Sequence, residues 1–167
     1  GGGTVGGQPY TKQQCYLKAL DIDPRYQYAW NNLGFEGGGT VGGQPYTKQQ
    51  CYLKALDIDP RYHNAWNNLG LQSGGTVGGQ QYTKQQCYLK ALDIDPRYHD
   101  AWNNLGSEGG GTVGGQPYTK QQCYLKALDI DSRHQYAWNY LGLQGGGTVG
   151  GQPYTKQQCY LKALDID

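Results

Sequence analysis

The chain has 167 residues, of which 28 are Gly, 16 Tyr, 5 Cys and 4 Trp, and it contains no Met. Its formal net charge is only +1, so it lacks the basic surface of a nucleic-acid binder or of a polybasic membrane anchor. Its apolar runs are too short to cross a bilayer, and no secretory signal pattern stands at Gly1. We therefore expect no nucleic-acid and no membrane partner, and the localisation stays unknown.

A segment of 36 residues recurs along the whole chain, which makes this a tandem-repeat protein. Full copies occupy residues 1–36, 37–72, 73–108 and 109–144, and a partial fifth copy occupies residues 145–167. Because the chain has no Met and stops inside a copy, we expect it to be an excerpt of one longer, continuous array.

Each copy contains the signals of two helices, which we describe in the first copy. Thr11 followed by Gln14 forms a capping box, so the first helix is predicted over Lys12–Ile22. Its apolar residues cover more than half of its circumference, so it must be packed on two sides. The second helix is predicted to follow Asp23 and Pro24, as cap and first turn, and to end near Glu36.

A glycine-rich segment separates the second helix of one copy from the first helix of the next. In the second copy it spans Gly37–Gly43, with the sequence GGGTVGG. Thr40 and Val41 followed by two glycines can form a tiny hairpin or an extended loop, and the sequence leaves both open.

The runs AWNNLG and, after a spacer, YLKALDIDP resemble the tetratricopeptide repeat. The matching positions are Trp30, Leu33, Gly34, Tyr52, Ala55, Leu56 and Pro60. The unit here has 36 residues against about 34 in the family, and Lys48 stands where the family has a small residue. The resemblance implies an all-α fold, a right-handed α-solenoid of helix-turn-helix repeats.

Nine of the 36 columns differ between copies, and three of these lie on one stripe of the second helix at i, i+4 and i+7. In tetratricopeptide proteins this face lines a concave groove that grips extended peptides. The resemblance therefore implies candidate groove residues, namely Tyr28, Asn31, Asn32, Phe35, Asn64, Asn67, Asn68, Asp100, Asn103, Asn104, Tyr136, Asn139 and Tyr140. Drift of an unconstrained solvent-facing stripe would explain the same variation.

The loop sequence GGTVGGQ is identical in all five copies. Repeated at each step, it would form a ridge that could pack against a neighbouring chain or carry modifications, including O-linked sugars, on hydroxyl groups. The candidate threonines are Thr4, Thr11, Thr40, Thr47, Thr76, Thr83, Thr112, Thr119, Thr148 and Thr155.

Little in the chain suggests chemistry at a reactive site. Each copy has one Cys and none forms a C-x-x-C pair, so we expect buried structural thiols. GGGTVG fits G-x-G-x-x-G in letters, but it follows a helix where a dinucleotide site needs a strand. His63, His99 and His134 occupy columns that other copies fill with Gln or Tyr. We predict no catalytic residue, no metal site, no cofactor and no enzymatic activity.

Two functions remain for the sequence as a whole. The first is a structural repeat protein whose copies stack, by self-association, into a fibre or extended scaffold. The alternative, implied by the resemblance, is an adaptor that binds an extended peptide or protein partner in its groove. The expected partners are accordingly the chain itself or another protein.

Overall fold

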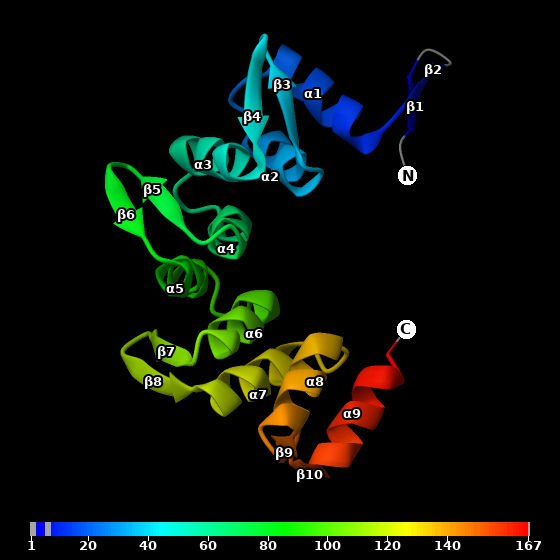
Figure 1. The fold of residues 1–167 in the computed structure, drawn as a ribbon, viewed down its shortest axis with the longest axis vertical. Helices are drawn as coiled ribbons and strands as arrows, with labels where there is room; N and C mark the ends of the chain where they lie inside the picture. Colours follow the sequence, from blue (N-terminus) through cyan, green and yellow to red (C-terminus); the bar gives the residue numbers. More distant parts are fainter. Residues whose placement is uncertain (1–2, 6–7, 167) are drawn as a thin grey trace. The chain divides into compact units, whose positions relative to one another are not determined.

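The computed structural model describes residues 3–5 and 8–166, and side chains from residue 9 to residue 166. Each full copy folds as a two-stranded hairpin followed by two helices, and the fifth copy contributes a hairpin and one helix (Figure 1). The chain divides into two compact units, Gly1–Cys87 and Tyr88–Asp167, each of which has its own helices and hairpins.

The elements of the first unit are β1 (Gly3–Val5), β2 (Gln8–Tyr10), α1 (Lys12–Ile22), α2 (Gln27–Phe35), β3 (Gly38–Val41), β4 (Gln44–Thr47), α3 (Lys48–Ile58), α4 (His63–Leu71), β5 (Gly75–Val77) and β6 (Gln80–Tyr82). Helix α5 (Lys84–Ile94) contains the boundary between the units. The second unit continues with α6 (His99–Ser107), β7 (Gly110–Val113), β8 (Gln116–Thr119), α7 (Lys120–Ile130), α8 (Gln135–Leu143), β9 (Gly146–Val149), β10 (Gln152–Thr155) and α9 (Lys156–Leu164).

The predicted first helix of the copy is confirmed in its bounds and in its cap. The Thr11 hydroxyl accepts a hydrogen bond from the Gln14 N–H, and the Gln14 side chain accepts one from the Thr11 N–H. The same capping box opens α3, α7 and α9. Two backbone donors at each of these helix starts are thereby satisfied, which fixes where the helix begins.

The second helix begins later than the sequence predicted. Helix α2 starts at Gln27, because the Asp23 carboxylate accepts a hydrogen bond from the Arg25 N–H at 2.9 Å and the Asp23 carbonyl accepts one from the Tyr26 N–H at 3.2 Å. These bonds close a turn around Pro24 instead of a first helical turn. The prediction that Asp23 caps this helix is therefore wrong.

The glycine-rich segment forms a β-hairpin, so the predicted all-α fold, a right-handed α-solenoid, is wrong. Strand β3 pairs antiparallel with β4, and Val41 lies opposite Gln44. The two residues between them, Gly42 and Gly43, have φ values of +55° and +81°. Two positive φ values in a two-residue loop are typical of the type I′ turn, whose twist matches that of paired strands. Each copy therefore mixes helix and strand.

The hairpin formed by β3 and β4 is anchored to the helices of the copy before it. The Gln13 side chain of α1 donates a hydrogen bond to the Gly38 carbonyl at 2.6 Å. The Tyr46 ring contacts the Trp30 ring edge to face, with centroids 4.8 Å apart, and the Trp30 indole N–H donates to the Pro24 carbonyl at 2.9 Å. The hairpin is thus fixed to both helices of the preceding copy.

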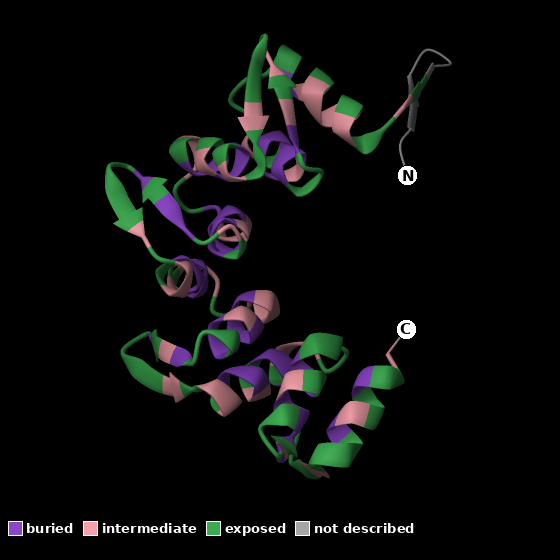
Figure 2. Ribbon diagram, viewed as in Figure 1, coloured by how far each residue is buried: buried purple, intermediate pink, exposed green. Residues whose placement is uncertain are grey.

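A glycine in the second helices α2, α6 and α8 lets the next first helix approach closely. A Cβ atom added to Gly34 would lie 2.6 Å from Cε1 of the buried Tyr52 ring, and Gly106 and Gly142 have the same relation to Tyr124 and Tyr160. Buried residues lie on α2, α3 and α4 of the first unit and on α6, α7 and α8 of the second (Figure 2). Ring-on-backbone packing therefore joins consecutive copies.

The cysteines lie at the same packed faces. Cys51, Cys87, Cys123 and Cys159 are buried free thiols, and Cys15 is half-buried. Burial raises the pKa of Cys51 to about 11 and that of Cys123 to about 12, because the interior disfavours the thiolate. The prediction of buried structural thiols is confirmed for these four residues.

The hairpin turn gives a first test. Gly114 has φ +57° and no atom within 4 Å of an added Cβ, so only its backbone conformation restricts the residue type. We expect Gly114→Val to lower the free energy of unfolding by about 1–2 kcal/mol and Gly114→Asn to change it much less. Urea denaturation measures both. Equal losses for Val and Asn would contradict a left-handed residue here.

The contact of glycine with tyrosine gives a second test. Gly34→Ala alone should destabilise the protein, because overpacking costs about 1–3 kcal/mol and exceeds the helix-propensity gain of about 1 kcal/mol. In a Tyr52→Ala background, the same change should destabilise much less, because only the Cys51 Cβ atom, at 3.1 Å, then crowds the added methyl group. A double-mutant cycle of urea denaturations measures this coupling. Additive effects would show that the ring does not restrict position 34.

Candidate functional site

The predicted groove residues lie along the second helices but differ in exposure. Tyr28, Phe35, Tyr136 and Asn139 are exposed, whereas Asn32, Asn64, Asn68, Asp100, Asn104 and Tyr140 are half-buried. The remaining three, Asn31, Asn67 and Asn103, are buried. The sequence predicted these three asparagines to lie on the groove face because of their helical spacing. Their side chains are buried, so only the other predicted residues have accessible side-chain atoms. We call columns 28, 32 and 35 of the second helices the outer stripe.

One buried asparagine joins neighbouring second helices in the first unit. The Asn68 side-chain amide of α4 donates to the side-chain Oδ1 atom of Asn31 on α2 at 2.9 Å. Asn31 is only 5% exposed, so this bond satisfies a polar atom that water reaches poorly. Asn31 and Asn68, both predicted as groove residues, here form a link between copies.

The corresponding link is missing in the second unit. Tyr140 replaces asparagine in the column of Asn68, and its ring stacks on Tyr124 with centroids 5.4 Å apart. The side-chain oxygen of Asn103, which corresponds to Asn31, is buried without a hydrogen-bond partner. A ring contact within the fourth copy therefore stands where the first unit has a polar link between copies.

The candidate threonines fall into two groups. Thr11, Thr47, Thr83, Thr119 and Thr155 are helix caps whose hydroxyls accept backbone hydrogen bonds. Thr40, Thr76, Thr112 and Thr148 lie on the hairpins and are exposed. The side chain of Thr4 is outside the described residues. A modification of the cap hydroxyls would compete with the helix starts, so the hairpin threonines are the more accessible group.

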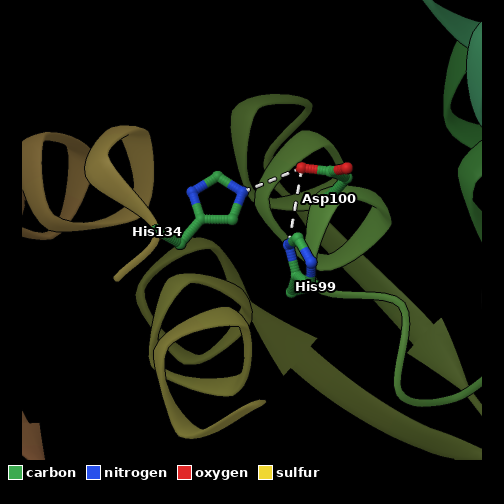
Figure 3. A group of neighbouring side chains, drawn as sticks. All are labelled: His99, Asp100 and His134. Atoms are coloured by element: carbon green, nitrogen blue, oxygen red, sulfur yellow. Dashed lines mark hydrogen bonds and ion pairs between the residues drawn. The ribbon is translucent and has the colours of Figure 1, made fainter. Parts of the chain in front are cut away.

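The structure brings together three side chains that the sequence did not connect (Figure 3). His99 and Asp100 are the first two residues of α6, and His134 is the N-cap residue of α8. The His134 Nε2 atom lies 3.0 Å from Asp100 Oδ1, and His99 Nδ1 lies 3.5 Å from the same oxygen. Both imidazole rings are turned toward the carboxylate.

The position of the His134 proton follows from its two contacts. Its Nδ1 atom accepts a hydrogen bond from the Ala137 N–H at 3.2 Å, so the neutral ring carries its proton on Nε2. That N–H points at Asp100. The hydrogen bond from His134 lowers the pKa of the Asp100 carboxyl; burial opposes this shift, and the nearby charges of His99 and His134 add to it.

The first unit has different residues in the same columns. Tyr28 and Tyr62 stand where Asp100 and His134 stand, and their rings meet edge to face with centroids 5.0 Å apart. Column-by-column comparison missed the cluster because each histidine is replaced in other copies. The sequence did contain one sign of the cluster: the residue types in all three columns differ between the third copy and the fourth.

Each unit contains a pocket lined by residues of equivalent columns. The pocket in the first unit has a volume of about 510 Å³ and that in the second about 430 Å³. Arg25, Trp30, Tyr46, Lys54 and Asp57 contribute to the first pocket, and Arg97, Trp102, Tyr118, Lys126 and Asp129 contribute to the second. Charges of both signs line each pocket, so it has no strong preference for an anion or a cation.

Comparison with known proteins gives no relative from which a function could be transferred. No protein-family model matches the chain, and no curated protein is significantly similar to it. None of the helices in the described ranges is long and apolar enough to span a membrane.

The asparagine link can be tested by removing its donor. Asn68→Ala should lower the free energy of unfolding by about 1–3 kcal/mol, because it leaves the buried Asn31 oxygen unpaired. The matched control is Asn139→Ala, since Asn139 occupies the column of Asn31 but is exposed; it should change stability by less than about 0.5 kcal/mol. Equal effects in thermal or urea denaturation would contradict the link.

Proposed function

We propose that this chain is a non-enzymatic tandem-repeat scaffold that binds an extended segment of another protein along its outer stripe. The observation that carries the proposal is the exposure of large apolar side chains there. Phe35 is 71% exposed and Leu71 is 52% exposed, in the same column of α2 and α4. Aromatic and aliphatic side chains held on rigid helices suit the centre of an interface.

In the first unit, the exposed apolar residues lie on neighbouring helices and not at isolated positions. The hydrogen bond between Asn31 and Asn68 holds α2 beside α4, so that Phe35 and Leu71 belong to neighbouring helices of one packed unit. The half-buried amide of Asn32 lies in the same stripe and offers donors and acceptors to a peptide backbone. The resemblance to the tetratricopeptide repeat, whose groove uses this face, supports the same assignment.

The state of the cysteines supports a non-enzymatic role. Burial raises the pKa of Cys51, Cys87, Cys123 and Cys159, whereas a nucleophilic cysteine needs an accessible thiolate. These thiols fill the interior of the copies. We therefore assign the binding role to the variable residues of the outer stripe and not to the cysteines.

The test uses residues that the array itself tolerates. Ser107 occupies the column of Phe35 and Leu71, so Phe35→Ser combined with Leu71→Ser should leave folding intact. Peptides selected from a random display library against the native chain should bind this variant about tenfold or more weakly, because both apolar anchors are lost. Calorimetric titration measures the affinities.

The matched control is Ile22→Ser, which removes an apolar side chain that is 86% exposed on α1, away from the outer stripe. Binding should survive this change. If the selected peptides bind the stripe variant as tightly as the native chain, or lose affinity equally with Ile22→Ser, the outer stripe is not the binding surface.

Self-association into a fibre or extended scaffold is the second candidate. It is favoured by the contact that joins consecutive copies, because the Gly34–Tyr52 pair recurs as Gly106–Tyr124 and Gly142–Tyr160. A copy from another molecule carries the same residues. Electron microscopy over a range of concentrations tests this candidate: growing filaments would support it, and discrete particles at every concentration would exclude it.

A further inference from the structure

We propose that His99, Asp100 and His134 form a binding site for a divalent transition-metal ion of the zinc class. The three side chains offer two imidazole nitrogens and one carboxylate oxygen, a donor set that suits zinc and its neighbours Co²⁺, Ni²⁺ and Cu²⁺. Asp100 belongs to column 28 of the outer stripe, but the inference does not require that a peptide binds there.

The distances between the donor atoms fit one small ion. The three atoms all lie within 4.8 Å of one another, with separations of 3.0 Å and 3.5 Å from Asp100 Oδ1 to His134 Nε2 and His99 Nδ1. Ligands at about 2.0–2.1 Å from a tetrahedral zinc ion lie roughly 3.3–3.4 Å apart. Small side-chain rotations would bring the three atoms to these spacings.

The His99 ring supplies an independent sign of a missing ligand. Its Nδ1 atom is buried and has no hydrogen-bond partner, although Asp100 Oδ1 is 3.5 Å away. A buried polar atom without a partner is uncommon and calls for an explanation such as a bound ion. An ion between the two residues would satisfy the nitrogen and the carboxylate together.

The surroundings hold the ligands and leave one side open. His134 is only 7% exposed in its side chain, so packing fixes its ring, whereas the Asp100 side chain is 48% exposed. Water can therefore complete the coordination shell on the Asp100 side, as it does in three-ligand zinc sites. The adjacent positions of His99 and Asp100 at the start of α6 limit the freedom of two of the three donors.

Binding requires a change of tautomer at His134. Metal coordination at Nε2 moves the ring proton to Nδ1, so the hydrogen bond from the Ala137 N–H is lost. The ion also displaces the contact between His134 and Asp100. Metal affinity is therefore reduced by the loss of two interactions, and we expect a reversible site and not a permanently occupied structural one.

The site can be removed with residues that other copies already use. His99→Gln, Asp100→Asn and His134→Tyr each install the residue found in the same column elsewhere, so folding should be kept. Calorimetric titration of the full chain with Zn²⁺ should show one saturable site, which each change weakens by about 100-fold or more, since loss of outer-shell partners alone costs about 10–100-fold. Bound Co²⁺ should give the visible absorption of nitrogen and oxygen ligands.

The matched control is His63→Gln, which removes a histidine from the column of His99 in the second copy. Zn²⁺ affinity should be unchanged by it. Native affinity in His134→Tyr and Asp100→Asn, an equal loss with His63→Gln, or a thiolate charge-transfer band with Co²⁺ would each overturn the proposed site. Circular dichroism of each variant establishes that it is folded before titration.

Discussion

Within each unit, the close contact between a glycine of a second helix and a tyrosine of the next first helix determines how consecutive copies pack. Because Gly34 has no Cβ, the Tyr52 ring can lie against the helix backbone. On the same helix, Trp30 is buried beside the hairpin, and its ring contacts the Tyr46 ring. The columns of the second helix that remain outside are then those of the outer stripe. Packing of invariant residues thus decides which variable residues can meet a partner.

Local signals predicted the first helix well because they act within one turn of backbone. The capping box of Thr11 and Gln14 satisfies its donors without help from the rest of the fold. The hairpin was harder to predict, because a Gly-Gly pair permits both a type I′ turn and an irregular loop. The choice depends on contacts beyond the segment, such as the bond from Gln13 to the Gly38 carbonyl. A helical repeat signature therefore did not reveal that strands lie between its helices.

The site shows the same limit at the level of contacts between copies. Asn31 lies on the predicted side of α2, yet it is buried and bonds to Asn68, a residue of the next copy. His134 contacts Asp100, which lies 34 residues earlier in the chain. Because the repeat has 36 residues, this contact joins column 26 of one copy to column 28 of the copy before it. Comparison of identical columns cannot detect such a pair. Comparison of contacting columns can, because Tyr28 and Tyr62 form the equivalent pair.

The contacts between copies near the second helices differ in chemistry between the two units. In the first unit, the Tyr28 ring meets the Tyr62 ring, and Asn68 bonds to Asn31. In the second unit, Asp100 and His134 supply a polar bond in place of the two tyrosines, whereas Tyr140 stacks on Tyr124 of its own copy and the Asn103 Oδ1 atom is unpaired. An aromatic pair and a hydrogen bond are each worth about 1 kcal/mol, so the exchange of the two tyrosines costs little stability. Variation can therefore accumulate between copies, and with it new side-chain clusters, while the glycine and tyrosine packing stays the same.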